Sequence, residues 1–140
     1  MVNRWPAEWE KHERTWMAWP TSGYSLGESD SEVAAARGAW SSVANAVVRH
    51  EPVTMIVSAD DVEVAREWLD ARVDIVTAPL DDAWMRDIGP TFVRDDTGAL
   101  LGVDWVFNGW GAQQWATWEK DAEIARTVLD LTESPIVSTP

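Results

Sequence analysis

The chain contains no cysteine among its 140 residues. This absence excludes disulfide bonds, thiolate metal sites and a cysteine nucleophile within the sequence. No apolar run approaches the roughly 18 residues that a membrane span requires. The first residues, Met1 to Pro6, also lack the apolar segment of a secretory signal. We therefore expect a cytoplasmic protein that does not associate with membranes.

Basic residues are scarce, with 11 Lys and Arg against 24 Asp and Glu, and the formal net charge is −13. This charge repels nucleic acid and anionic membranes and attracts cations. We therefore expect no nucleic-acid partner, whereas a merely solvated acidic surface and a site for a cationic ligand both stay open. With 46% hydrophobic residues and the length of one domain, the sequence predicts a single domain over residues 1–140.

Tryptophan is abundant, with 11 residues against 2 phenylalanines and 1 tyrosine. Most of these side chains can serve as large core residues. Several, however, stand in loop-like contexts beside proline, glycine or acidic residues, where an aromatic face near a carboxylate suits a cation or a sugar. They are Trp5, Trp9, Trp19, Trp84, Trp110 and Trp115.

The first half of the chain alternates short apolar runs with helical patterns, which indicates an α/β fold. Three strands are expected, over residues 14–19, 53–57 and 73–77. Apolar residues at helical spacing predict a helix over residues 29–49, which Ser29 and Glu32 begin as a capping box. A second helix over residues 60–69, capped by Asp60, would join the last two strands into a βαβ unit.

The second half predicts a hairpin and one more helix. Residues 91–94 and 100–106 flank a turn that contains Gly98, and this spacing is typical of paired strands. Thr117 can cap the last helix, and residues 136–138 begin another strand. This final strand indicates either that the natural polypeptide continues or that the sheet ends in a short edge strand.

The segment from Asp81 to Pro90 carries four ionised side chains and a tryptophan between two expected strands. Loops at the mouth of a sheet commonly form the binding sites of α/β folds. Asp87 can accept two parallel hydrogen bonds from a guanidinium group while the face of Trp84 stacks on the same plane. Arg86 and Asp87 can equally form internal salt bridges that fix the loop, so the residues alone leave both interpretations open.

Other chemistry is less well supported by the residues. Asp81, Asp82 and Asp87 could bind Mg²⁺ or Ca²⁺ through oxygen, but no glycine-spaced calcium loop accompanies them. Paired carboxylates could hydrolyse glycosides, but nothing in the sequence fixes the separation that this reaction needs.

Three segments of the chain resemble the agmatine deiminase and bacterial-type peptidylarginine deiminase family. They are residues 6–20 (Pro6-Ala7-Glu8-Trp9-Glu10 to Trp19-Pro20), residues 82–93 (with Trp84-Met85-Arg86-Asp87-Ile88-Gly89-Pro90) and residues 103–111 (with Asn108-Gly109-Trp110-Gly111). They follow the family's order and spacing, and they resemble only the N-terminal part of its enzymes.

The resemblance implies a pentein fold, an α/β propeller of ββαβ-type repeats around a pseudo-fivefold axis, of which this chain would form the first part with a mixed sheet and βαβ units. It also implies hydrolysis of a guanidinium group to a ureido group with release of ammonia. In that reaction a cysteine thiolate forms a covalent intermediate and a histidine acts as general acid and base. The resemblance implies no metal and no organic cofactor, and it places the enzyme in polyamine metabolism, in putrescine biosynthesis.

The resemblance assigns roles to individual residues. Asp87 becomes the catalytic carboxylate that binds the guanidinium group, and Trp84 becomes the residue that stacks beside it. Asn108 and Trp110 lie in the loop that contacts the rest of the substrate. Because that loop carries no arginine to meet a substrate carboxylate, the resemblance favours agmatine, with peptidylarginine as the other substrate.

The departures from the family are large. The His-x-Asp pair, the Glu-Gly-Gly segment and the catalytic cysteine of the family are missing. We therefore expect the 140-residue chain by itself to be inactive, and to self-associate through apolar surfaces that would otherwise meet the missing repeats. Two alternatives are an acidic, tryptophan-rich binding module without catalysis, for a cationic or sugar ligand, and a structural fragment without function.

Overall fold

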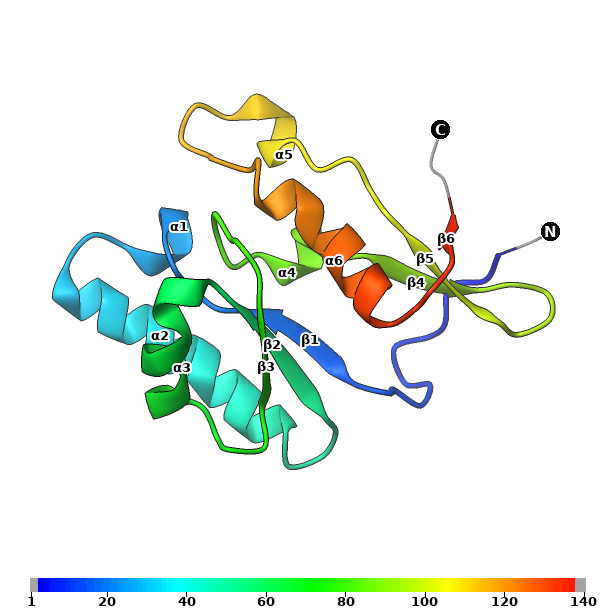
Figure 1. The fold of residues 1–140 in the computed structure, drawn as a ribbon, viewed down its shortest axis with the longest axis horizontal. Helices are drawn as coiled ribbons and strands as arrows, with labels where there is room; N and C mark the ends of the chain where they lie inside the picture. Colours follow the sequence, from blue (N-terminus) through cyan, green and yellow to red (C-terminus); the bar gives the residue numbers. More distant parts are fainter. Residues whose placement is uncertain (1–2, 138–140) are drawn as a thin grey trace.

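The computed structural model describes residues 3–137, which form an α/β fold with two three-stranded sheets (Figure 1). The first sheet is parallel and has the strand order β1-β2-β3, whereas the second is mixed and has the order β4-β5-β6. The strands are β1 Thr15–Ala18, β2 Val53–Val57, β3 Asp74–Thr77, β4 Thr91–Arg94, β5 Leu100–Val103 and β6 Ile136–Val137. The predicted α/β class, with a βαβ unit and a mixed sheet, is confirmed.

Most helical segments are short. The α-helices are α1 Gly23–Leu26, α2 Asp30–Val47, α3 Val62–Trp68, α4 Met85–Ile88, α5 Gly109–Ala112 and α6 Ile124–Leu131, and the 3₁₀ turns are η1 Ala59–Asp61 and η2 Asp121–Glu123. None of the helices within residues 3–137 combines the length and the apolar character that crossing a bilayer demands.

Helix α2 begins at the predicted capping box. The Ser29 hydroxyl accepts a hydrogen bond from Glu32 N at 3.3 Å, and the Glu32 carboxylate accepts one from Ser29 N at 2.9 Å. The predicted cap of the next helix is wrong, because Asp60 lies inside η1 and no side chain caps α3. Its neighbour Asp61 instead accepts a hydrogen bond from Thr21 and pairs with Arg37 at 3.3 Å.

Strand β2 is buried along its whole length and separates two apolar cores. On one face Met55 packs with residues of α2 and α3, including Ala44 and Ala65. On the other face Ile56 packs with Ile88 of α4 and with residues of α6. The first sheet is therefore covered on both faces, as expected for parallel strands, and α4 is held between the sheet and α6.

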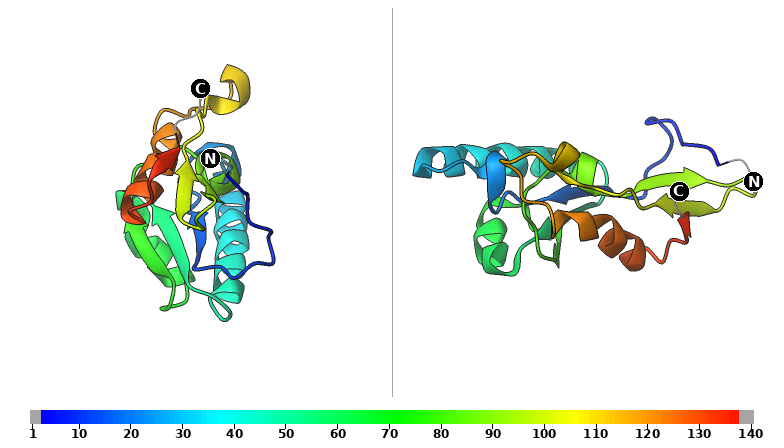
Figure 2. Two further views of the ribbon diagram at one scale, coloured as in Figure 1. Left: turned by 90° about the vertical axis from the view of Figure 1, so that its right-hand side faces the viewer. Right: turned by 90° about the horizontal axis from the view of Figure 1, so that it is seen from above.

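The second sheet projects from the first as a hairpin, with β6 beside it (Figure 2). Gly98 adopts a φ of +86° in the predicted turn, and the strand that follows ends at Val103, earlier than expected. Gly102 lies directly under α6, where an added Cβ would come within 1.9 Å of a Leu129 methyl carbon. A glycine at this position therefore allows α6 to pack closely on the hairpin.

The last helix and the last strand agree in part with the prediction from the sequence. The last helical segment begins with η2 at Asp121, and Thr117 lies before it and does not cap it. The predicted final strand is present as β6, which pairs with β5 in parallel, and Ser138 lies outside the described residues.

Candidate functional site

The loop that follows β3 lies at the carboxyl edge of the first sheet, next to the segment that follows β1. The Ser22 hydroxyl donates to the Asp81 carbonyl oxygen at 2.7 Å, which joins these two segments. The loop then enters α4, and this helix ends at Ile88, immediately before Gly89 and Pro90, because proline cannot continue a helix and restricts the residue before it. A position at the carboxyl ends of parallel strands is where α/β folds place their ligands.

Asp82 fixes this loop from within. Its carboxylate, which is 5% exposed, accepts hydrogen bonds from Tyr24 N at 3.0 Å, Ala83 N at 2.7 Å and the Trp84 indole N–H at 3.1 Å. Ser25 adds its hydroxyl and its backbone N–H. Asp82 is thus a structural acceptor that ties α1 to the loop and sets the orientation of the Trp84 ring.

A second buried carboxylate holds the start of the loop. Asp121, which is 1% exposed, accepts hydrogen bonds from Asp81 N at 2.8 Å and from Asp82 N at 3.0 Å. Asp81 in turn accepts one from Lys120 N at 2.8 Å. Burial raises the pKa of Asp121 to about 6, and the nearby carboxylates of Asp81 and Asp82 add to the increase.

Trp84 presents a half-buried ring that is surrounded by other aromatic rings. Its centroid lies 6.4 Å from that of Trp40 and 6.3 Å from that of Trp110, and both contacts are edge-on, at 79° and 87°. Together with the hydrogen bond to Asp82, these contacts hold the indole in one orientation.

Asp87 is exposed in the single turn of α4, beside the aromatic rings. Its Oδ1 atom accepts a hydrogen bond from the Trp110 indole N–H at 3.2 Å. Within residues 3–137 it belongs to no ion pair, and the adjacent Arg86 pairs instead with Glu8 at 3.6 Å. The internal Arg86–Asp87 salt bridge that the sequence left open is therefore not formed.

The segment that carries Trp110 has an uncommon backbone. Gly109, Trp110, Gly111 and Ala112 have φ angles of +62°, +56°, +88° and +57°, so α5 is a left-handed turn and not a regular helix. A non-glycine residue in this region costs about 1–2 kcal/mol, and such strain gathers at functional sites. The Asn108 side chain caps the turn by accepting from Gly111 N at 2.9 Å, which uses the oxygen of a predicted substrate-binding residue.

Further aromatic side chains extend this surface. The rings of Trp110 and Trp115 stack at 5.3 Å with 23° between their planes, and Phe107 meets Trp110 edge-on at 5.1 Å. Tyr24 lies 5.7 Å from Trp115. We call Trp84, Trp110 and Asp87, with these neighbouring rings, the aromatic–acidic cluster. The structure thus brings Trp84, Asp87 and Trp110 together, with Asn108 at the base of the turn.

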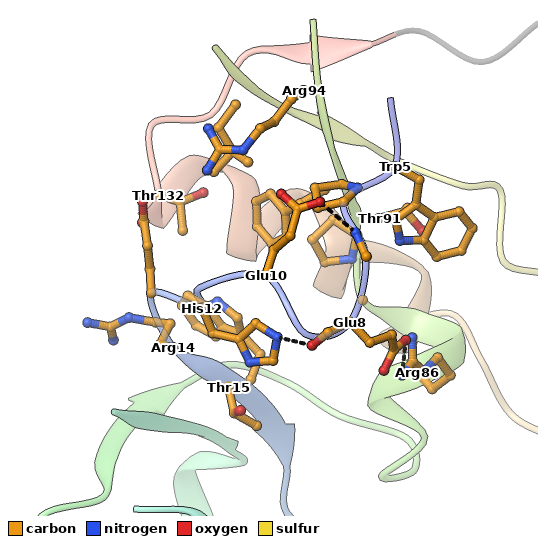
Figure 3. A pocket seen from close by; sticks show the side chains of 18 of the residues that line it. Trp5, Glu8, Glu10, His12, Arg14, Thr15, Arg86, Thr91, Arg94 and Thr132 are labelled. Carbon is orange, nitrogen blue, oxygen red and sulfur yellow. Dashed lines mark hydrogen bonds and ion pairs between the residues drawn. The ribbon is translucent and has the colours of Figure 1, made fainter. Parts of the chain in front are cut away.

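A separate groove of about 650 Å³ lies between β4 and residues 5–14, which we call the N-terminal arm (Figure 3). Glu8, Glu10, His12 and Arg86 line it, but Trp84, Asp87 and Trp110 do not. In the close-up, His12 Nε2 donates to the Glu8 carbonyl oxygen at 2.8 Å, and the Glu8 carboxylate faces Arg86. These charged side chains contact one another, so they hold the N-terminal arm in place.

Within residues 3–137, no three His, Asp or Glu side chains are grouped so that they could hold a metal ion. The carboxylates of Asp81 and Asp82 accept hydrogen bonds from backbone N–H groups, so these oxygens are already in use and are not free to bind a metal. Sequence reasoning missed the structural roles of Asp82 and Asp121. The donors of Asp82 include residues 57 and 58 positions away, so local pattern could not reveal them.

Comparison with known proteins shows the family to which the chain belongs. A family model described as "Porphyromonas-type peptidyl-arginine deiminase" matches residues 4–140. A Streptomyces coelicolor protein named "Putative agmatine deiminase" is 59% identical over 140 residues, which are 100% of this chain and 41% of that protein. An agmatine deiminase of Stutzerimonas stutzeri is 45% identical over 130 residues, which are 90% of this chain and 34% of that protein.

Solved structures of agmatine deiminases share the fold of this chain. An agmatine deiminase of Enterococcus faecalis superposes with a TM-score of 0.85 at 29% identity, over 98% of this chain and 38% of that one. A C. jejuni agmatine deiminase with substrate bound shares the fold, with a TM-score of 0.77 at 18% identity. The chain spans well under half the length of these relatives. It belongs to the Porphyromonas-type peptidyl-arginine deiminase family and forms the N-terminal part of that family's pentein fold.

Proposed function

We propose that the chain is the N-terminal part of a larger deiminase domain and supplies the substrate clamp of a guanidine-group hydrolase. In this proposal the Asp87 carboxylate binds the guanidinium group by two parallel hydrogen bonds and Trp84 stacks on its plane. Trp110 and Asn108 belong to the loop that contacts the rest of the substrate.

The proposal rests on the surroundings of Asp87. This carboxylate is exposed beside an aromatic surface, and no cation pairs with it in residues 3–137. Trp110 uses one lone pair of one carboxylate oxygen, and an ionised carboxylate has about four such sites. A guanidinium group therefore finds two oxygens and a set of indole faces within one cluster, and the net charge of −13 favours a cationic ligand.

The proposed reaction converts the guanidinium group and one water molecule into a ureido group and ammonium. A thiolate adds to the guanidinium carbon, ammonia leaves, and water then displaces the thiolate from the amidino intermediate. Because the 140 residues include no cysteine, we propose that this chain supplies the clamp and not the nucleophile, and that it is inactive by itself. Incubation of the purified chain with agmatine should yield no ureido product above a blank.

Agmatine is the substrate we favour, and peptidylarginine is the other candidate. The loop around Trp110 contains glycines, alanine and glutamine but no arginine to pair with a substrate carboxylate. This composition suits a guanidino amine that has no carboxylate. With agmatine as substrate, the reaction is a step towards putrescine in polyamine metabolism, and we place it in the cytoplasm.

Tryptophan fluorescence tests the clamp. The chain is titrated with agmatine, arginine and a neutral sugar, in parallel with Asp87→Asn, which keeps the side-chain shape but removes the charge. Asp130→Asn, an exposed position on α6, controls for the change in net charge. We expect quenching that is strongest with agmatine, is lost in Asp87→Asn and persists in Asp130→Asn.

Two results would refute the clamp. A response to the sugar that Asp87→Asn leaves unchanged would support the alternative, an acidic, tryptophan-rich binding module without catalysis. A titration in which neither cation nor sugar alters the fluorescence would remove both ligand-binding hypotheses for this chain.

We also propose that the isolated chain self-associates. Several large apolar side chains are exposed, including Trp9 at 89%, Val106 at 87% and Trp5 at 65%. Exposed apolar surface of this kind drives association. Light scattering after size-exclusion chromatography should give a mass above that of one chain, and a mass that stays at 15.7 kDa at all concentrations would contradict this proposal.

A further inference from the structure

The aromatic–acidic cluster extends away from Asp87 as a row of exposed rings. Trp110, whose indole N–H donates to Asp87, stacks on Trp115 with 5.3 Å between the ring centroids and 23° between their planes. Tyr24 follows at 5.7 Å from Trp115. Trp115 is 58% exposed and Tyr24 is 77% exposed, so these two rings form an open end of the cluster. The proposed function gives neither ring a role.

The opposite end of the cluster is closed. The ring of Trp84 is half-buried, and Trp40 meets it edge-on at 6.4 Å. The Trp84 indole N–H donates to the carboxylate of Asp82, which is 5% exposed. A ligand whose head group lies between Asp87 and Trp84 therefore has room to extend toward the open end of the cluster and not past Trp84.

The two rings at the open end come from segments that are far apart in the sequence. Tyr24 lies in α1, where its backbone N–H donates to the buried carboxylate of Asp82 at 3.0 Å. Trp115 lies in the loop that follows the left-handed turn of residues 109–112, and it stacks on Trp110. Trp115 is thus held between two other rings, while more than half of its own surface stays open to solvent.

No cation of the chain itself occupies these ring faces. Within residues 3–137, the one cation–π contact is that of Arg14 over Trp16 at 5.7 Å, outside the cluster. The face of an aromatic ring attracts a cation, and tryptophan does so more strongly than the other aromatic residues. The net charge of −13 favours positive groups at this surface as well. The open end of the cluster is therefore suited to a cation that the ligand brings.

We propose that Trp115, with Tyr24 beside it, forms a second cation subsite that selects guanidino compounds whose distal group is positively charged. The inference rests on the proposed function, because Asp87 must first bind the guanidinium group. In agmatine a tetramethylene chain joins the guanidinium group to a primary ammonium group. In this proposal the ammonium group lies against the exposed part of the Trp115 ring, and Trp115 is a specificity-determining residue.

The chemistry of the distal group decides how well a ligand fits this subsite. An ammonium group is attracted by the aromatic faces, whereas a methyl group gains packing alone. A carboxylate is repelled by the negative faces of the rings and by the acidic surroundings. We therefore expect agmatine to bind most tightly, followed by n-butylguanidine and then by γ-guanidinobutyrate.

Isothermal titration calorimetry compares agmatine with n-butylguanidine, which keeps the guanidinium group and the chain length but ends in a methyl group. The proteins are the wild-type 140-residue chain, Trp115→Leu and, as a control, Trp9→Leu, which removes a tryptophan that is 89% exposed on the N-terminal arm. A cation–π contact at an exposed site corresponds to about a threefold change in affinity. We expect the preference for agmatine to fall about threefold in Trp115→Leu and to stay unchanged in Trp9→Leu. The general attraction of the acidic chain for a dication is the same in all three proteins and cancels in this comparison.

A second measurement needs no substitution at the subsite. Nuclear magnetic resonance follows the indole N–H signals of Trp84 and Trp115 in the wild-type chain while each ligand is added. We expect the Trp84 signal to shift with both ligands, because both carry the guanidinium group, and the Trp115 signal to shift further with agmatine. A Trp115 signal that responds identically to the two ligands would show that the distal ammonium group does not reach this ring.

The outcomes separate the inference from the proposed function. If Asp87→Asn abolishes binding of both ligands while Trp115→Leu keeps the wild-type preference for agmatine, the second subsite is refuted and the clamp stands. If neither ligand binds the wild-type chain, or if both bind Asp87→Asn equally well, the clamp fails and the subsite fails with it. If Trp115→Leu does not fold, the resonance titration of the wild-type chain decides.

Discussion

The clearest prediction separates two aspartates that lie five positions apart in the same loop. Asp82→Ala should unfold the protein more easily, whereas Asp87→Ala should leave its stability almost unchanged. The reason is their environment, because Asp82 is 5% exposed and accepts five hydrogen bonds, while Asp87 is exposed and accepts one from Trp110.

The magnitude for Asp82→Ala follows from the donors that lose their acceptor. Tyr24 and Ser25 lie in a segment that water reaches, so solvent replaces part of their loss. Ala83 N is buried and the Trp84 indole N–H is half-buried, at 2.7 and 3.1 Å from the carboxylate. Each hydrogen bond to a charged acceptor contributes about 1.5 kcal/mol. Two such losses give a decrease of about 3 kcal/mol in the free energy of unfolding.

Urea denaturation measures this difference. With a slope of about 1.5 kcal/mol per molar urea, the midpoint for Asp82→Ala should fall by about 2 M. Asp87→Ala should shift it by less than about 0.5 M, because a single exposed hydrogen bond contributes little. Equal midpoints for the two variants would refute the division of this loop into a structural acid and a ligand-binding acid.

Three further predictions follow from individual contacts. Gly102→Ala should lower the free energy of unfolding by about 1–3 kcal/mol in urea denaturation, because the new methyl group meets Leu129, and a loss below 0.5 kcal/mol would contradict the close packing of α6. The pKa of Asp121 is raised to about 6 from an ordinary value near 3.8. Between pH 3.8 and about pH 6, the native state therefore binds more protons than the unfolded state. The free energy of unfolding should therefore fall as pH rises from about 4 to above 6, by about 3 kcal/mol in total, and Asp121→Asn should flatten this slope. Trp110→Phe keeps an aromatic ring but removes the N–H that Asp87 accepts, so agmatine affinity measured by calorimetry should change while the urea midpoint stays within about 0.5 M of wild type.

Local patterns predicted much of this fold because their causes are local. The capping box of Ser29 and Glu32 joins residues three positions apart, and both hydrogen bonds are present. The hairpin around Gly98 was predicted from a turn residue between two short apolar runs, and β4 and β5 pair as expected. The same reasoning failed where a side chain had another partner available. Neither Asp60 nor Thr117 caps a helix, and Asp61 instead binds Thr21 and Arg37 from distant segments.

By itself the sequence determined the α/β class, the family and the charged loop that holds Trp84 and Asp87, because apolar periodicity, composition and motif spacing are properties of neighbouring residues. Only the tertiary structure decided which acids are structural and which one faces solvent. Asp82 and Asp121 receive N–H groups from segments 39 to 58 residues away, whereas Asp87, among residues 3–137, receives only the indole N–H of Trp110. A carboxylate has the same chemistry at each of these positions, and its role depends on the donors and the solvent that folding places around it.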